Sequence, residues 1–189
     1  MPDLINPDRG NFVKKGSYTR AELLECAHGG WGQMPKLPAP PFLMFDRIVE
    51  INATGGAHGK GLIRAELDVR DDLPFFGAHF VGDPVTPGCL QLDAGWQLLG
   101  CFLGHQGALG KGRATGLVFP KNWKELKELP DPVSFTGQIL PDAKLVSFTV
   151  ELTSKRIAAI SIGIGNGVVE CDGAVVCRMN GLRVNILPQ

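Results

Sequence analysis

Two side chains in this sequence are suited to proton transfer, a histidine and a carboxylate set among apolar neighbours. His79 lies in the aromatic stretch 75–84, and Asp93 lies in the otherwise apolar run 89–103. Apolar surroundings perturb a titratable base, and an unpaired buried carboxylate is costly. With a backbone N–H from Gly88 at an expected helix start, the three groups suit proton removal next to a carbonyl. The base takes the proton, the carboxylate handles the leaving group, and the N–H stabilises the oxyanion.

Each of these residues also has a non-catalytic explanation. His79 could be an ordinary core histidine, and Asp93 could be held by a hydrogen bond from Gln97, one helical turn later. Cys89, close to the expected helix start, suits either a nucleophile or a small apolar packing residue. The sequence contains no HExxH, phosphate-loop or G-x-S-x-G pattern, and no metal or cofactor is expected.

The other histidines are expected to be structural. His28 and His58 fall in glycine-rich stretches typical of exposed loops. His105 falls at the end of the long expected helix, where a partly positive imidazole would suit the helix dipole.

The elements that position these residues follow from periodicity and turn residues. Thr86-Pro87 predicts the start of a helix that runs to about Leu103 and is apolar nearly all round, so the rest of the fold should wrap it. Strands are expected at 45–51, 63–69 and 146–152, with turns at 165–167 and 171–173. One long buried helix among many strands indicates an α+β domain with a sheet curled around it.

Three further segments complete the predicted organisation. Residues 1–16 are expected to be a flexible arm. The Thr19-x-x-Glu22 spacing predicts a capping box for a short helix that ends at Gly29-Gly30. The proline-bracketed segment 120–132 predicts a short amphipathic helix projecting between two strands.

Composition excludes several classes of protein. The 189 residues carry 19 basic and 19 acidic side chains, a balance that argues against a general nucleic-acid binder. No apolar run is long enough to span a membrane. Five cysteines without CxxC spacing favour reduced thiols, so a cytoplasmic location is expected.

The stretch from Ala78 to Leu98, AHFVGDPVTPGCLQLDAGWQL, strongly resembles the signature of the bacterial 3-hydroxydecanoyl-acyl-carrier-protein dehydratase/isomerase family. Further similarity at 43–48, 54–61, 64–69, 111–114 and 135–141 extends the resemblance over about residues 17–187. The resemblance implies a hot-dog fold, in which a curved antiparallel sheet wraps one long helix. It also implies a single domain over residues 17–189, with an insertion at about 119–132, and a homodimer with shared active sites.

The resemblance also implies roles for individual residues. His79 and Asp93 match the catalytic pair, with the histidine of one subunit facing the aspartate of the other. Gly88 matches the residue whose N–H binds the thioester carbonyl, and Val85 the residue whose carbonyl orients the histidine. Cys89 and Gln97 are placed with these two among the substrate-binding residues. The positions that match the basic residues for docking acyl carrier protein are Lys155, Arg156 and Arg183.

The implied activity is dehydration of a (3R)-3-hydroxyacyl-acyl-carrier-protein to the trans-2-enoyl thioester, with isomerisation to the cis-3 product. The alternatives are a dehydratase or hydratase without isomerase activity in another acyl-thioester pathway, and a non-catalytic acyl-binding protein. Three positions on or beside the helix depart from the family and are expected to alter the pocket. Thr86 stands where the family usually has Met, Gln91 where it usually has Gly, and Gly95 where a larger apolar residue is common.

Overall fold

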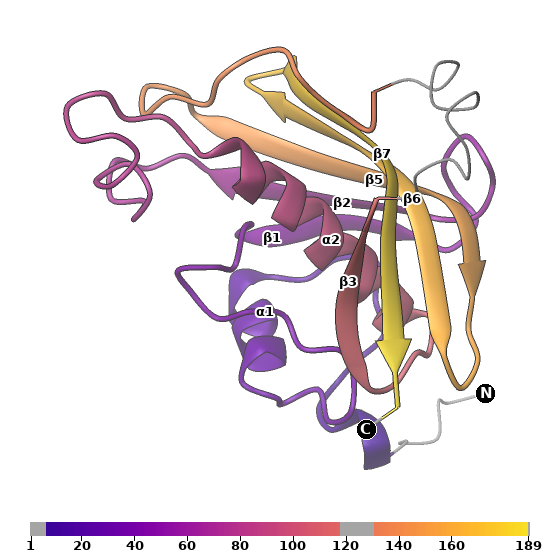
Figure 1. Cartoon of the computed structure of the whole chain (residues 1–189). Helices are drawn as coiled ribbons and strands as arrows, with labels where there is room; N and C mark the ends of the chain where they lie inside the picture. Colours follow the sequence, from indigo (N-terminus) through magenta and orange to yellow (C-terminus); the bar gives the residue numbers. More distant parts are fainter. Residues whose placement is uncertain (1–6, 118–130, 189) are drawn as a thin grey trace.

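In the computed structural model, which describes residues 7–117 and 131–188, a curved antiparallel sheet wraps one long helix (Figure 1). The elements in chain order are η1 (Pro7–Arg9), α1 (Arg20–Ala27), β1 (Arg47–Asn52), β2 (Leu62–Asp68), α2 (Gly88–His105), β3 (Lys111–Leu117), β4 (Val133–Phe135), β5 (Leu145–Arg156), β6 (Ser161–Cys171) and β7 (Ala174–Leu187). The strand order is β1-β2-β5-β6-β7-β3, and β4 pairs with β7. The α+β architecture expected from the sequence is therefore confirmed.

Alternation along the strands places one side of the sheet against α2. In β5, Val146, Phe148, Val150 and Leu152 are all buried, and their neighbours are more exposed. The same alternation in β7 buries Leu182, Val184 and Ile186. The sheet and helix thus share one hydrophobic core, as the apolar character of the helix predicted.

Glycine allows α2 to approach the sheet closely at its middle. A Cβ added at Gly95 would lie 2.9 Å from Leu182 Cδ1 and 3.2 Å from Met179 Sδ, and a Cβ at Gly167 would lie 2.7 Å from Met179 Cε. The Met179 side chain therefore fills the space left by two glycines. Gly95 was expected to shape the substrate pocket, but the structure gives it this packing contact with β7 instead.

The short helix α1 begins where the sequence predicted. The Glu22 carboxylate accepts hydrogen bonds from both the N–H and the hydroxyl of Thr19 at 2.9 Å. The Gly30 N–H donates to the Glu25 carbonyl at 2.8 Å, closing the helix end. The capping box and the glycine stop are both confirmed.

One of the two predicted turns is absent. Residues 165–167 are not a turn: β6 runs through them, with a shift of register between Gly165 and Gly167 where it pairs with β7. Asn166 turns its side chain to accept a hydrogen bond from the Gly181 N–H at 3.0 Å, so its polarity serves a bulge. The turn expected at 171–173 is present, with positive φ angles at Asp172 and Gly173.

The start of α2 is displaced by one residue from the expected cap. Pro87, and not Thr86, is the N-cap of the helix. The Thr86 N–H donates to the Ile139 carbonyl at 2.9 Å, which connects this residue to the segment between β4 and β5.

None of the described helices is long and apolar enough to cross a membrane.

Part of the segment predicted as an arm makes contacts with the folded domain. Arg9 Nη2 donates to the Gly104 carbonyl at 2.7 Å, and the Asn11 N–H donates to the Gly30 carbonyl at 2.8 Å. The Phe12 ring packs edge-on against Trp31 with centroids 5.1 Å apart. Residues 1–6 lie outside the described residues, as does most of the predicted insertion and its helix.

The partly positive imidazole expected at His105 is contradicted by its surroundings. The ring is only 5% exposed, and burial lowers its pKa to about 4. Nε2–H donates to the Lys15 carbonyl at 3.0 Å, while Nδ1 accepts from the Gln106 amide at 2.9 Å. Each ring nitrogen therefore has the partner that suits a neutral ring. A second proton, on Nδ1, would point at the Gln106 amide N–H, which is itself a donor.

This burial predicts that the protein loses stability in mild acid. The pKa of His105 is about 4 in the folded state against about 6.5 unfolded, so the unfolded chain binds more protons between those values. The stabilisation is complete above pH 6.5 and is lost as the pH falls toward 4, to a total of about 3 kcal/mol. Urea unfolding from pH 7 to 4 should show this slope in the wild type, and His105→Gln should flatten it. The exposed His58→Gln is the matched control, and an unchanged slope in His105→Gln would contradict the assignment.

Candidate active site

The loop before α2 folds back on itself so that His79 meets Val85. His79 Nδ1 lies 3.0 Å from the Val85 carbonyl oxygen, and the Val85 N–H donates to the His79 carbonyl at 2.8 Å. Because a carbonyl only accepts, Nδ1 carries the proton, and Nε2 of the neutral ring is left as the acceptor. The Phe80 ring stacks on the imidazole with centroids 4.0 Å apart. The histidine is thereby held in one orientation with a basic nitrogen available.

Asp93 is positioned by Gln97 from the next turn of α2. Gln97 Nε2 donates both to Asp93 Oδ2 and to the Phe42 carbonyl, the latter at 2.8 Å. Gln97 Oε1 accepts from the Met44 N–H at 3.2 Å. The hydrogen bond expected between Gln97 and Asp93 is present, and the segment before β1 fixes the amide that makes it. This arrangement gives Gln97 a positioning role, and direct contact with a substrate remains a prediction.

Within one protomer, Asp93 lines a groove of which His79 is not a part. Asp93 opens with Trp96 and Gln97 onto a groove of about 270 Å³ whose far side includes Arg113 of β3. His79 is not among the residues that line this groove. The Asp93 carboxylate is half-buried and not fully enclosed, so the burial expected from the sequence is only partial in the single chain.

The helix start supplies the expected N–H. Gly88 is the first residue of α2, so its N–H has no partner within the helix. A Cβ at this position would lie 2.9 Å from the Phe135 ring of β4, which explains why a glycine stands here. Cys89 follows it with its side chain exposed, so the packing role considered for this thiol is not met within the protomer.

The structure separates the three basic residues expected to dock a carrier protein. Lys155 Nζ donates to the Ala53 carbonyl at 2.6 Å and lies 5.1 Å from the centroid of the Phe102 ring of α2. Burial, and then the charge of Lys60, lower its pKa. Strand alternation places Arg156 and Arg183 on the opposite face, away from α2.

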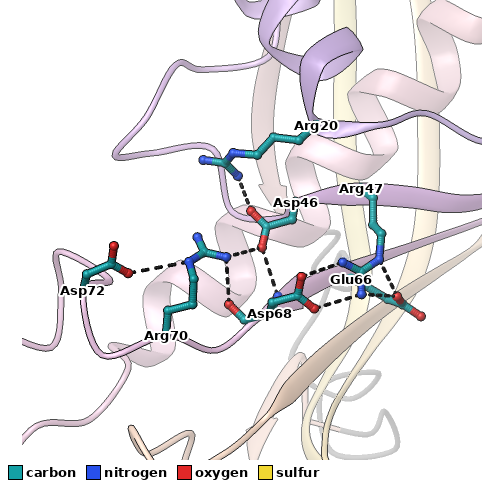
Figure 2. A network of polar contacts seen from close by, with 7 residues as sticks. All are labelled: Arg20, Asp46, Arg47, Glu66, Asp68, Arg70 and Asp72. Carbon is teal, nitrogen blue, oxygen red and sulfur yellow. Dashed lines mark hydrogen bonds and ion pairs between the residues drawn. The ribbon is translucent and has the colours of Figure 1, made fainter.

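A polar network, which the sequence reasoning missed, anchors the segment that holds Gln97. Figure 2 shows Asp46 between Arg20 and Arg70, with both guanidinium groups on its carboxylate. Its Oδ2 accepts from Arg70 Nη1 at 2.7 Å and from the Asp68 N–H at 3.0 Å. The Asp46 hydrogen bond raises the pKa of Arg70. A buried acid that follows the apolar residues 43–45 was the available signal, since such a carboxylate requires partners.

Removing the charge of Asp46 should destabilise the fold. The Asp46 side chain is 7% exposed, while its two arginine partners are 40% and 41% exposed and partly screened. We therefore expect Asp46→Asn to lower the free energy of unfolding by about 2 kcal/mol, less than for a fully buried pair. Urea unfolding measures the change. Asp72→Asn, whose side chain is 84% exposed, is the control and should stay within about 0.5 kcal/mol of the wild type. Equal stability of the two variants would contradict this reading.

With this geometry in place, comparison with known proteins shows the family. Residues 37–180, which span both His79 and Asp93, match the model of the FabA-like domain. The chain belongs to the FabA-like domain family.

Two solved structures are similar to this chain. The dehydratase heterocomplex ApeI:P from Xenorhabdus doucetiae aligns with a TM-score of 0.56 at 14% identity, covering 80% of this chain and 86% of that one. AziG from S. sahachiroi aligns with a TM-score of 0.48 at 12% identity, covering 75% and 90%. At these identities the first similarity supports the hot-dog fold alone, and it agrees with the curved sheet around α2.

Proposed function

We propose that this FabA-like domain dehydrates 3-hydroxyacyl thioesters, with His79 as the base and Asp93 as the group that assists the departing hydroxyl. The observation that carries the proposal is the orientation of His79, whose Nδ1–H is bound to the Val85 carbonyl so that Nε2 can accept a proton. Nε2 removes a proton from C2, the electrons form the C2–C3 double bond, and the 3-hydroxyl leaves as water with a proton from Asp93. The Gly88 N–H binds the thioester oxygen as negative charge develops on it.

A second copy of the chain would complete this site, because the groove that Asp93 lines does not include His79 among the described residues. The face of α2 that carries Cys89, Asp93 and Trp96 is only partly covered. Nearby in the chain, the loop residues Phe80 and Val81 are 57% and 89% exposed. Exposed apolar side chains close to a catalytic site that one chain leaves incomplete favour a protein–protein interface. We propose a homodimer in which His79 of one protomer faces Asp93 of its partner.

Isomerisation is the finer part of the proposal. After dehydration, the same Nε2 could remove a proton from C4, and reprotonation at C2 would give the cis-3 thioester without any new catalytic group. The requirement is that the chain bends so that C4 reaches the imidazole. We propose acyl carrier protein as the carrier and, from the reduced cysteines, a cytoplasmic enzyme.

Product analysis tests the activity. The protein is incubated with 3-hydroxyacyl thioesters on acyl carrier protein, and the products are separated by chromatography and identified by mass. We expect loss of one water, with trans-2 and cis-3 isomers both formed. Formation of the trans-2 product alone refutes the isomerase step and leaves the dehydratase. Recovery of unchanged substrate refutes both and favours an acyl-binding role.

Carrier docking should depend on the exposed arginine of the β5 end. Arg156 is exposed, and reversing its charge should raise KM for the carrier-bound substrate by about 3- to 10-fold, with the effect shrinking as salt rises. The KM for the same acyl group on pantetheine should stay unchanged. Arg178→Glu, which alters an exposed arginine of β7, is the control. Equal effects of the two variants would refute the docking role.

A further inference from the structure

A small apolar pocket lies between the start of α2 and the sheet. Nine of its eleven lining residues are hydrophobic, among them Leu67 of β2, Phe148 of β5 and Leu90 of α2. The remaining two are Thr86 and Gln91. Its free volume is about 10 Å³, the space of roughly one water molecule. The pocket therefore admits one small group in this conformation.

Two side-chain oxygens of this pocket, one on each polar residue, are buried without hydrogen bonds among the described residues. Thr86 is 9% exposed and Gln91 is 3% exposed. Thr86 Oγ1 and Gln91 Oε1 find no hydrogen-bond partner within residues 7–117 and 131–188. Buried polar atoms are almost always paired, and leaving them unpaired is costly. Gln97 of the same helix, by contrast, has hydrogen-bond partners for both its side-chain oxygen and its side-chain nitrogen.

The pocket is lined in part by residues close in the chain to the proposed catalytic base. The His79 N–H donates to the carbonyl of Phe75 at 2.8 Å, and Phe75 lines the pocket. On the other side, Thr86 follows Val85, whose carbonyl holds the imidazole. Both segments that contact His79 therefore continue into the lining of this pocket, through Phe75 and Thr86.

We propose that this pocket recognises the far end of a short acyl chain that carries a hydroxyl group. A hydroxyl both donates and accepts, so it can accept from Thr86 Oγ1–H and donate to Gln91 Oε1, which pairs both orphaned atoms. A long unsubstituted chain meets two unpaired polar groups and too little space. This inference rests on the proposed function, since it names the substrate class of that same site.

Calorimetric binding tests the preference without requiring turnover. The probes are a saturated short-chain acyl-pantetheine thioester and its terminally hydroxylated counterpart, neither of which carries the 3-hydroxyl that is eliminated. We expect the hydroxylated probe to bind at least about tenfold tighter to the wild type. In Thr86→Val with Gln91→Leu, which keeps the shapes and removes the polar atoms, the plain probe should bind as well or better. Binding of both probes with equal affinity to the wild type overturns the inference and leaves the proposed function intact. Failure of both probes to bind overturns the two together.

Thermal unfolding gives a second test that is independent of any ligand. Because Gln91→Leu removes an unpaired buried polar atom, it should raise Tm by about 2–4 °C in the free protein. Gln97→Leu is the matched control in the same helix: it breaks three hydrogen bonds and should lower Tm. A lower Tm for Gln91→Leu would show that the amide is already paired in the free protein and would overturn the inference.

Discussion

Replacing His79 by alanine should reduce kcat for dehydration by about 10²- to 10⁴-fold, the usual contribution of a general base. The variant loses the imidazole whose Nδ1–H is bound to the Val85 carbonyl and whose Nε2 is left to accept a proton. Its Tm should fall little, because the ring is half-buried in a loop and makes one side-chain hydrogen bond. Stopped assays of enoyl product, with Tm measured on the same samples, separate chemistry from folding.

His58→Ala is the matched control for this variant. His58 is exposed in the turn between β1 and β2, and its removal should leave kcat unchanged. Turnover of His79→Ala close to that of the wild type would remove the histidine from the mechanism, whatever the fold.

Replacing Asp93 by asparagine should also lower kcat by about 10²- to 10⁴-fold. The amide keeps the shape of the carboxylate and can still accept the Gln97 hydrogen bond through Oδ1, so the segment around Phe42 stays in place. The loss then reports the acidic group itself and not its packing. Asp71→Asn, an exposed carboxylate in the loop before His79, should retain full turnover. A wild-type rate in Asp93→Asn would show that another group protonates the departing hydroxyl.

The sequence predicted best those features that depend on local spacing. The capping box from Thr19 to Glu22 needs residues three apart, and the Asp93–Gln97 hydrogen bond needs residues one helical turn apart. Strand alternation in β5 follows from a period of two and buried the expected side chains. In each case a few neighbouring residues determine the geometry, which is why the pattern alone was sufficient.

Features that depend on distant segments could not be predicted in this way. His105 is neutral because segments distant in the sequence bury its ring, and Nε2–H donates to the carbonyl of Lys15, 90 positions away. The glycines around Asn166 favour a turn locally, yet pairing with β7 on one side and β5 on the other extends the strand through them. Lys155 donates to the carbonyl of Ala53 in the loop between β1 and β2, a contact that no local pattern reveals.

The shared active site is the central claim, and subunit exchange between two inactive variants tests it most directly. His79→Ala and Asp93→Ala are each purified, mixed in equal amounts under conditions that exchange subunits, and assayed for dehydration. Half of the dimers then pair one variant with the other, and each holds one site with both His79 and Asp93 intact, so we expect about a quarter of the wild-type sites to recover. Heterodimers that form, as shown by native mass spectrometry, yet remain inactive would contradict a site built from His79 of one protomer and Asp93 of its partner.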